Sequence, residues 1–349
     1  MSGPRPPAYL SEYAREAEPR LRAFLERKSA EVERQPVDLR AAFAMLRDYV
    51  LRGGKRLRGA LAVLGCEAAG GGRAQALDAS IGIELLHAYL LIHDDFMDRD
   101  EVRRGGPTLH TALGGALGEH LGDSVAILLG SLCEAWAVEL VLSAPVAPER
   151  ALAAGRIVAQ ALQHVIVGQM ADLAAPRGPE LSEAAVLAVQ RMKTGSYTFE
   201  LPLRLGAVLG GASATALEAL ERFARPLGQA FQIADDLLGT FGAPQTTGKP
   251  NANDLREGKR TLLVARALAS AQPEDERRLR AGLGKRDLSD SEADELRAIL
   301  VRSGAEKSSR DEAERLVAQA LRALEGAPVP AAVSAVLREV AEYAVRRSL

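Results

Sequence analysis

The apolar positions of this chain recur mainly with the 3.6-residue period of an α-helix. Between residues 73 and 98, for example, Leu77, Ile81, Leu85 and Ala88 lie three or four positions apart and share one helical face. Alanine and leucine dominate, and the β-branched and aromatic runs typical of strands are scarce. The pattern predicts an all-α protein. The predicted helices cover roughly 39–52, 73–98, 116–143, 148–174, 182–208, 213–239, 259–271, 290–303, 309–325 and 330–346.

Asp38 is expected to be the N-cap of the first of these predicted helices. Glycine and proline clusters separate the others, and no tandem repeat or long polar linker divides the chain. We therefore expect a disordered, proline-rich tail over residues 1–8 and one all-α domain over residues 9–349. The clusters lie chiefly at 104–107, 176–179, 210–212 and 242–250.

Composition narrows the class of protein. The 349 residues include 44 basic and 46 acidic side chains, a net charge of −2, and no basic arm, so we expect no nucleic-acid partner. Cys66 and Cys133 lie far apart in apolar stretches, which argues against a disulfide framework or a zinc site. Buried free thiols are typical of a reducing compartment, so we expect a cytoplasmic protein.

The most apolar stretch, residues 125–146, is interrupted by Gly130, Ser131, Glu134 and Glu139. An uninterrupted span needs about 18 apolar residues, so we expect no transmembrane segment. The N-terminus also lacks the apolar core of a signal peptide.

Carboxylates are concentrated at the end of one apolar predicted helix. Asp94, Asp95 and Asp98 follow the apolar run HAYLLIH, and Asp94 and Asp98 are an i, i+4 pair on one face. Like charges at that spacing repel, so a cation is expected between them, and hard oxygen ligands favour magnesium over zinc. The alternative is a solvated acidic face, which the apolar flanks make less favourable.

A second pair, Asp235 and Asp236, follows another apolar helical run, AFQIA. Two such pairs predict facing metal ligands across the central cavity of a helical bundle, with open magnesium positions for water and phosphate oxygens. Basic residues near predicted helix ends suit phosphate binding, although surface cations are the commoner fate of such residues. They are Lys55, Arg58, Arg103, Arg104, Lys193, Lys249 and Lys259.

Five segments in order between residues 53 and 261 carry a resemblance to a known family: GGKRLR, HAYLLIHDDFMDRDEVRRGGPTLH, MKTGSYTFELP, QAFQIADDLLGTFG and TGKPNANDLREGKRT. The chain resembles the trans-isoprenyl diphosphate synthases, or polyprenyl synthetases. The resemblance implies a single large helical bundle around a central cavity. It also implies magnesium-dependent head-to-tail condensation of isopentenyl diphosphate with an allylic diphosphate (dimethylallyl, geranyl or farnesyl).

The resemblance also implies roles for the aspartates. Asp94 and Asp98 are expected to hold two of three magnesium ions and Asp235 the third. Asp95 and Asp236 are expected to orient these ligands or to accept hydrogen bonds from water.

The resemblance assigns the basic residues to two diphosphate groups. Arg103, Lys193, Lys249 and Lys259 are expected to bind the allylic diphosphate, with Lys259 on a lid rich in glycine, proline and asparagine. The isopentenyl diphosphate pocket is expected to comprise Lys55, Arg58, His87 and Arg104.

Helix geometry supports His87 independently of the resemblance. At about 100° per residue, His87, Asp94 and Asp98 fall within about 40° of one another. The alternative is a hydrogen-bonded core histidine.

Lys193, Thr194 and Gln232 match the positions that stabilise the carbocation in the family. Gly195 permits a helix distortion that would turn the Lys193 carbonyl into the cavity. The leaving diphosphate is expected to remove the final proton.

Gly239 departs from the family pattern, because an aspartate is often found there as the fifth residue of the second motif. Its absence is expected to weaken binding of the third magnesium, although DDLLG followed by TGK and DLREGKRT resembles one bacterial branch of active synthases. One alternative is a non-catalytic or regulatory subunit. A terpene cyclase is another, but it would not need Lys55, Arg58 and Arg104.

Product length and assembly are the last expectations. Tyr89 and Leu90 precede Asp94 by about one helical turn, where they would line the cavity floor. Leu90 is not aromatic and the first motif has no insertion, which resembles geranylgeranyl (C20) synthases, with a farnesyl (C15) product as the alternative. The apolar segment SVAILLGSLCEAWAVELVL and the family both indicate a homodimer, unless that helix is fully internal.

Overall fold

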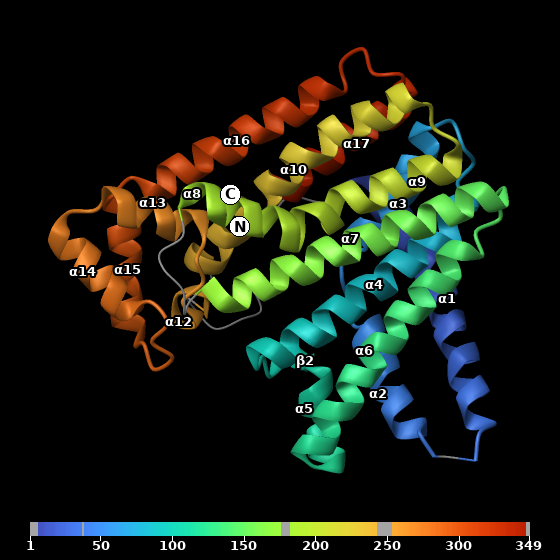
Figure 1. Cartoon of the computed structure of the whole chain (residues 1–349), viewed down its shortest axis with the longest axis horizontal. Coiled ribbons are helices and arrows are strands. Elements are labelled where there is room, and N and C mark those ends of the chain that lie inside the picture. Colours follow the sequence, from blue (N-terminus) through green and yellow to red (C-terminus); the bar gives the residue numbers. More distant parts are fainter. Residues whose placement is uncertain (1–5, 37, 176–181, 243–252, 347–349) are drawn as a thin grey trace. The chain divides into compact units, whose positions relative to one another are not determined.

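The computed structural model describes residues 6–36, 38–175, 182–242 and 253–346, which are helical apart from one two-stranded hairpin and short connections (Figure 1). The all-α fold class is therefore confirmed. The elements are α1 (Ala8–Glu33), α2 (Arg40–Leu51), α3 (Leu57–Ala68), α4 (Ala74–Asp98), β1 (Val102–Arg103), β2 (Gly106–Pro107), α5 (Leu109–Leu117), α6 (Glu119–Leu142), α7 (Pro148–Ala174), α8 (Glu183–Gln190), the π-helix η2 (Arg191–Glu200), α9 (Leu201–Gly210), α10 (Ala214–Phe241), α12 (Asn253–Glu257), α13 (Leu262–Ser270), α14 (Pro273–Gly282), α15 (Asp290–Arg302), α16 (Ala305–Ala323) and α17 (Ala331–Arg346).

The described residues form two compact units. The α4 unit comprises residues 6–156 and 205–212, and the α10 unit comprises the described parts of 157–204 and 213–346. Within the described residues, the chain passes from one unit to the other within α7, within α9 and between Ala212 and Ser213. The single domain over residues 9–349 stays a prediction.

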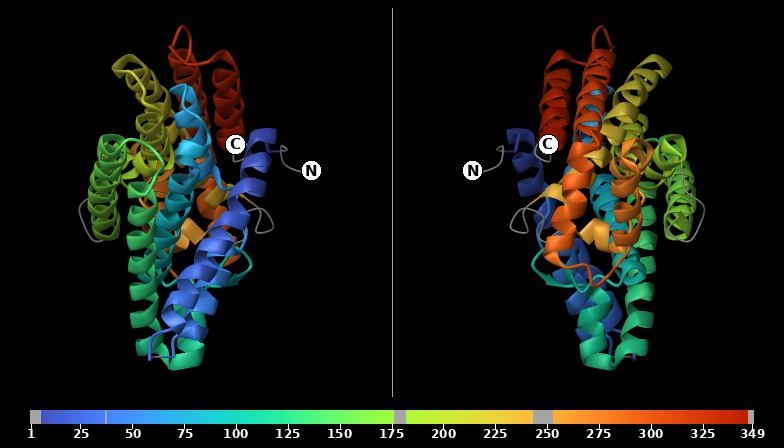
Figure 2. Two further views of the ribbon diagram at one scale, coloured as in Figure 1. Left: turned by 90° about the vertical axis from the view of Figure 1, so that its right-hand side faces the viewer. Right: turned by 90° about the vertical axis from the view of Figure 1, so that its left-hand side faces the viewer.

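In the α4 unit, helix α4 packs against α3 and α6, and α5 packs against α6 (Figure 2). Gly82 permits the close α4–α6 contact, because a Cβ there would lie 2.8 Å from the carbonyl oxygen of Ala137. Cys66 and Cys133 are buried free cysteines in this unit, as the sequence predicts.

In the α10 unit, helix α10 packs against α16 and η2 (Figure 1). Residues 191–200 form a π-helix, so the helix distortion predicted around Gly195 is confirmed. A Cβ at Gly228 of α10 would lie only 2.8 Å from the Gly195 carbonyl oxygen. The backbones of α10 and η2 are therefore in direct contact at this point.

The helix boundaries follow the predicted pattern closely in the middle of the chain, where α7 begins and ends as expected. Helices α1, α3, α12 and α14 lie outside the predicted ranges, as does α5 except for its last two residues. A signal for α1 is present, because Tyr13, Ala17, Leu21 and Phe24 have helical spacing and are buried.

The two predictions for the N-terminal region have different outcomes. Residues 1–5 of the predicted tail lie outside the described residues, and α1 already begins at Ala8. The prediction of Asp38 as an N-cap is wrong, because α2 begins at Arg40 with Leu39 at its N-cap position. The Asp38 carboxylate instead accepts a hydrogen bond from the Arg40 backbone N–H at 3.3 Å and pairs with its guanidinium at 2.8 Å.

Three helices, α4, α6 and α7, are long and apolar enough to cross a membrane by length and composition. Most of the apolar window of α4 is buried inside the protein, whereas most of the windows of α6 and α7 is not. The absence of a membrane span therefore stays a prediction.

Candidate active site

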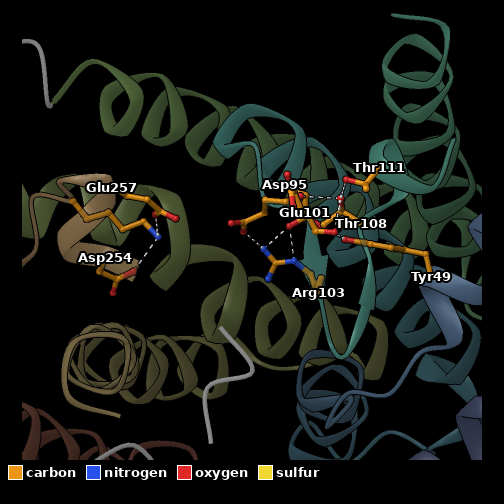
Figure 3. A network of polar contacts seen from close by, with 10 residues as sticks. Tyr49, Asp95, Glu101, Arg103, Thr108, Thr111, Asp254 and Glu257 are labelled. Carbon is orange, nitrogen blue, oxygen red and sulfur yellow. Dashed lines mark hydrogen bonds and ion pairs between the residues drawn. The ribbon is translucent and has the colours of Figure 1, made fainter. Parts of the chain in front are cut away.

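The first aspartate group lies at the C-terminal end of α4. Asp95 is buried, with 1% of its side chain exposed, and it accepts a hydrogen bond from the Tyr49 hydroxyl at 2.6 Å. The Arg103 guanidinium also donates to Asp95 and pairs with Asp100 at 3.1 Å (Figure 3). Asp95 is thus a structural anchor, and Arg103, expected on the allylic diphosphate, contacts this carboxylate.

Burial raises the pKa of Asp95 above its usual range. The positive charge of Arg103 and the hydrogen bond from Tyr49 oppose this shift without cancelling it. Asp94 and Asp98, the predicted metal ligands, are half-buried on the same helix.

The β1–β2 hairpin positions both arginines of the RRGG segment. Arg103 pairs with Gly106 in the strand register, and Arg104 adopts a left-handed backbone with φ of 51°. The Arg104 guanidinium then donates to the Gly53 carbonyl at 3.1 Å. It also lies 3.2 Å from where a Cβ of Gly54 would be, so only glycine suits that position, whose φ is +120°.

A second basic group lies at the start of α3 and in the loop that precedes it. Arg58 lies on the first turn of α3, and its guanidinium nitrogen Nη1 is 3.3 Å from Nε2 of His87. Burial, followed by the charge of Arg58, lowers the pKa of His87 well below its usual value, so the imidazole is neutral and accepts the Arg58 hydrogen bond. The structure places the Arg58 and Arg104 charges near His87, and Lys55 is exposed in the preceding loop. Their role as a diphosphate pocket stays a prediction.

The second aspartate pair lies on α10. Asp236 is buried and accepts hydrogen bonds from the side-chain amides of Gln190 at 2.5 Å and Gln232 at 2.7 Å. Burial, and after it the charge of Asp254, raises the pKa of Asp236 well above its usual range. Asp235 is exposed. Gln232, which is expected to stabilise the carbocation, therefore also donates a hydrogen bond to the buried Asp236.

The π-helix η2 carries Lys193 and Thr194, both half-buried. The Lys193 ammonium donates to the carboxylate of Asp172 on α7 at 2.7 Å. A Cβ at Gly168, four residues before Asp172, would lie 2.6 Å from the Lys193 backbone nitrogen. The close approach of α7 to η2 therefore needs a residue without a side chain.

The space beside Gly239 is filled by another carboxylate. A Cβ at Gly239 would lie 2.1 Å from Oδ2 of Asp254 on α12, so these two positions cannot both carry side chains in this conformation. Lys259 pairs with Asp254 at 3.2 Å and with Glu257 at 2.8 Å (Figure 3). Lys249 lies outside the described residues.

Sequence reasoning missed Tyr49, Gln190, Asp172 and Asp254, each of which contacts a predicted site residue or fills its place. Asp254 had a signal, because it lies in the segment TGKPNANDLREGKRT that carries the resemblance. The local pattern around the other three does not distinguish them from ordinary helix residues.

The donor chemistry fits magnesium better than zinc. Within the described parts of the chain, no group of three or more His, Cys, Asp or Glu side chains could hold a metal ion. Magnesium typically binds one or two carboxylates together with water and substrate phosphates, and the aspartate pairs offer such carboxylates. Because the pairs belong to different units, their facing arrangement stays a prediction.

Residues 40–300 match the polyprenyl synthetase family. A geranylfarnesyl diphosphate synthase from Aeropyrum pernix is 36% identical over 84% of this chain and 91% of its own length. A (2E,6E)-farnesyl diphosphate synthase from Mycobacterium tuberculosis is 34% identical over 84% of this chain and 80% of its own. Among solved structures, a geranylgeranyl pyrophosphate synthase from Corynebacterium glutamicum, complexed with isoprenyl diphosphate and magnesium, superposes with a TM-score of 0.92. It is 34% identical and covers 97% of this chain and 99% of its own.

The family match, the relatives and the structural similarity identify a prenyltransferase of the isoprenoid synthase fold. The chain belongs to the polyprenyl synthetase family and is a short-chain prenyl diphosphate synthase.

Proposed function

We propose that this protein condenses isopentenyl diphosphate head-to-tail with an allylic diphosphate in a magnesium-dependent reaction. The observation that carries the proposal is that basic side chains lie beside one part of α4 and carboxylates lie at its end. Arg58, His87 and Arg104 form a group of basic and neutral donors around the loop before α3. Further along the helix, Asp94 and Asp98 provide carboxylates, so one diphosphate binds to side chains alone and the other through metal.

The metal ligands in this proposal are Asp94 and Asp98 for two ions and Asp235 for a third. Magnesium, when bound, stabilises the negative charge that develops on the leaving diphosphate. Asp95 and Asp236 stay buried and hold the helix ends, through Tyr49 and Arg103 in one case and through two glutamine amides in the other.

The chain's own cations bind the allylic diphosphate. Lys193 and Lys259 are both paired with carboxylates, Asp172 and Asp254, and the incoming diphosphate competes for them. Arg103 and Lys249 complete the proposed allylic group, and donors aimed at the leaving oxygens lower the barrier to ionisation.

In the proposed reaction, the allylic carbon–oxygen bond breaks and its electron pair leaves with the diphosphate. The double bond of isopentenyl diphosphate attacks the allylic cation, and the new cation loses a proton to the departed diphosphate. The carbonyl of Lys193, the hydroxyl of Thr194 and the amide of Gln232 are the proposed dipoles that stabilise positive charge, and the π-helix is the distortion that such a carbonyl needs.

The proposal is tested by incubating the purified protein with labelled isopentenyl diphosphate, an allylic primer and magnesium. Formation of a longer prenyl diphosphate that stops in excess chelator is expected. Product formed equally well in chelator would overturn the metal assignment.

The two substrate pockets are separable by mutation. Arg58→Ala and His87→Ala are expected to raise KM for isopentenyl diphosphate by about tenfold or more, and KM for the allylic primer much less. Lys193→Ala is expected to show the opposite bias or mainly a lower kcat. Equal effects of all three on both substrates would contradict the pocket assignment.

For product length we propose a C20 diphosphate, with C15 as the alternative. The named relatives make products of different lengths at similar identity, so the assignment rests on the cavity floor. Tyr89 is buried and packs edge-on against the His93 ring at 4.7 Å between ring centroids, and Leu90 is half-buried. Tyr89→Ala is expected to lengthen the products and Leu90→Phe to shorten them, measured by chromatography after dephosphorylation. An unchanged distribution in both variants would discard this floor.

A non-catalytic subunit is a second candidate, and Gly239 is the observation that favours it. The position of Asp254 weakens this candidate, because a carboxylate already occupies the space beside Gly239. A purified chain that binds both substrates and magnesium but forms no product alone would support the subunit role.

We further propose a homodimer, on the basis of exposed apolar side chains. In the α4 unit they include Leu121, Leu128 and Leu142 of α6, and in the α10 unit Met170 and Val167 of α7. Burial of such a face against a second copy removes it from water. Sedimentation showing only monomer at micromolar concentration would contradict the dimer.

We also propose that the protein is cytoplasmic. The alternative is that the exposed apolar faces of α6 and α7 contact a membrane. Cell fractionation is expected to leave the protein in the supernatant after high-speed centrifugation. Recovery in the membrane pellet after a high-salt wash would contradict this.

A further inference from the structure

Glu84 is a buried carboxylate on α4 that none of the site assignments uses. It lies three residues before His87, and only 5% of its side chain is exposed. Its Oε1 accepts a hydrogen bond from the backbone N–H of Gly59 at 2.8 Å, and its Oε2 accepts one from Nη1 of Arg56 at 3.5 Å. One carboxylate therefore contacts the chain two residues before Arg58 and one residue after it.

Arg56 is the buried member of the GGKRLR loop, with 4% of its side chain exposed. It has a left-handed backbone, with φ of 47°, which a residue with a side chain adopts only where its surroundings hold it. Its Nη2 donates to the Val50 carbonyl at 3.0 Å, which ties it to the end of α2. The Arg56 side chain thus points inward while Lys55, its neighbour, is exposed.

These contacts determine how the loop meets α4. Glu84 holds Arg56 through one oxygen and the first turn of α3 through the other, and His87 follows one helical turn later on the same rigid helix. Arg58 lies between the two positions that Glu84 holds, and its Nη1 is 3.3 Å from Nε2 of His87.

We propose that Glu84 is the positioning residue of the isopentenyl diphosphate pocket. Through Arg56 and the Gly59 N–H it fixes Lys55 and Arg58 in register with His87, so that a metal-free diphosphate meets a preformed set of donors. The inference rests on the proposed function, because it takes this basic group to be the isopentenyl diphosphate pocket.

The contacts of Glu84 with Arg56 and with the Gly59 N–H fix more geometry than the stability of the fold requires. A buried ion pair is often replaceable by apolar residues of similar volume without loss of stability, whereas removing one partner leaves a buried charge uncompensated. What an apolar replacement does not reproduce is the directed hydrogen bond to the N-terminus of α3 and the fixed direction of Arg56. A purely structural pair and a positioning pair therefore differ in ligand affinity.

The test compares Glu84→Gln with Glu18→Gln in the full-length protein. Glu18 also pairs with Arg56, at 3.6 Å, but 49% of its side chain is exposed, so it is a matched control of the same charge. Calorimetric titration with isopentenyl diphosphate alone, without metal or allylic substrate, is expected to show about tenfold weaker binding for Glu84→Gln and less than about twofold for Glu18→Gln.

Steady-state kinetics supplies the second readout. Glu84→Gln is expected to raise KM for isopentenyl diphosphate by a similar factor, with KM for the allylic primer within about twofold of wild type. Equal increases in both constants, or unchanged affinity for isopentenyl diphosphate in a folded variant, would overturn the inference.

A double variant, Arg56→Met with Glu84→Met, covers the case in which the single variant does not fold, because it removes both buried charges together. It is expected to fold by circular dichroism and still to bind isopentenyl diphosphate about tenfold more weakly. Wild-type affinity in the double variant would overturn the inference. If the wild-type protein itself binds no isopentenyl diphosphate, the proposed function fails instead.

Discussion

The two aspartate pairs have the same sequence and different surroundings. In the α4 unit, the buried member Asp95 contacts a guanidinium and a phenol, those of Arg103 and Tyr49. In the α10 unit, the buried member Asp236 contacts two neutral amides, those of Gln190 and Gln232. Burial raises the pKa of both, but only the first has an opposing cation in contact.

The comparison shows that the same Asp-Asp sequence can lie in two different electrostatic environments. In the first pair, the Arg103 guanidinium in contact with Asp95 offsets part of the cost of burying that carboxylate. In the second pair, Asp236 is held by hydrogen bonds from neutral amides. The negative charge of Asp254 raises its pKa further. Lys259 also lowers the pKa of Asp236, but less than burial and Asp254 raise it.

The largest expected effect is a loss of kcat when an aspartate of either pair is removed, compared with removal of an ordinary helix carboxylate. Asp94→Ala and Asp235→Ala are each expected to lower kcat about 100-fold or more, because each removes a proposed ligand of the magnesium at the leaving group. Asp78→Ala on α4 and Glu218→Ala on α10 are the controls, since both remove exposed, ion-paired carboxylates. Steady-state condensation assays check this, and loss of activity in the controls would contradict it. The helical fold of each variant is checked by circular dichroism, and the metal-free Asp94→Ala protein is expected to be no less stable.

The next effect tests the cation beside Asp95. Arg103→Met is expected to lower the free energy of unfolding by about 2–4 kcal/mol, because it leaves Asp95 buried without a compensating charge. The figure is below that of a fully buried pair, since 18% of the Arg103 side chain is exposed. Arg99→Met, which removes an exposed ion pair with Asp123, is expected to change it by less than about 0.5 kcal/mol. Urea denaturation of the two variants decides, and equal stabilities would contradict the role given to Arg103.

A smaller effect is expected on the amide side of the comparison. Gln190→Met removes one of two hydrogen bonds to Asp236 and is expected to lower the free energy of unfolding by about 1–2 kcal/mol. Gln319→Met, at an exposed position of α16, serves as its control. A loss as large as that of Arg103→Met would mean that the two pairs are held equally strongly, and the contrast between them would fail.

The smallest expected effect concerns Gly239. Gly239→Ala forces the Asp254 carboxylate away, and this cost offsets the helix propensity gained, so stability is expected to stay within about 1 kcal/mol of wild type. The change in kcat is expected to be only severalfold. Gly115→Ala in α5 has open space around its Cβ and is the control. A more active Gly239→Ala variant would show that Asp254 does not contribute to the site.

Much of the fold was accessible from the sequence because helical periodicity is local. The bounds of α7, the end of α4 at Asp98 and the distortion at Gly195 all follow from neighbouring residues. The start of α2 could not be predicted in this way. Asp38 binds both the side chain and the backbone of Arg40 and does not cap the helix. That choice between a side-chain partner and a backbone cap depends on geometry that spacing does not express.

The helical class, the two aspartate pairs and the candidate basic residues can all be recognised from short segments of sequence. Their partners depend on the tertiary packing. Tyr49 reaches Asp95 across 46 positions of chain, Gln190 reaches Asp236 across the same interval, and Glu84 reaches Arg56 across 28. A buried carboxylate must find a donor or a cation, but sequence spacing does not say which one, because that depends on which helices pack together.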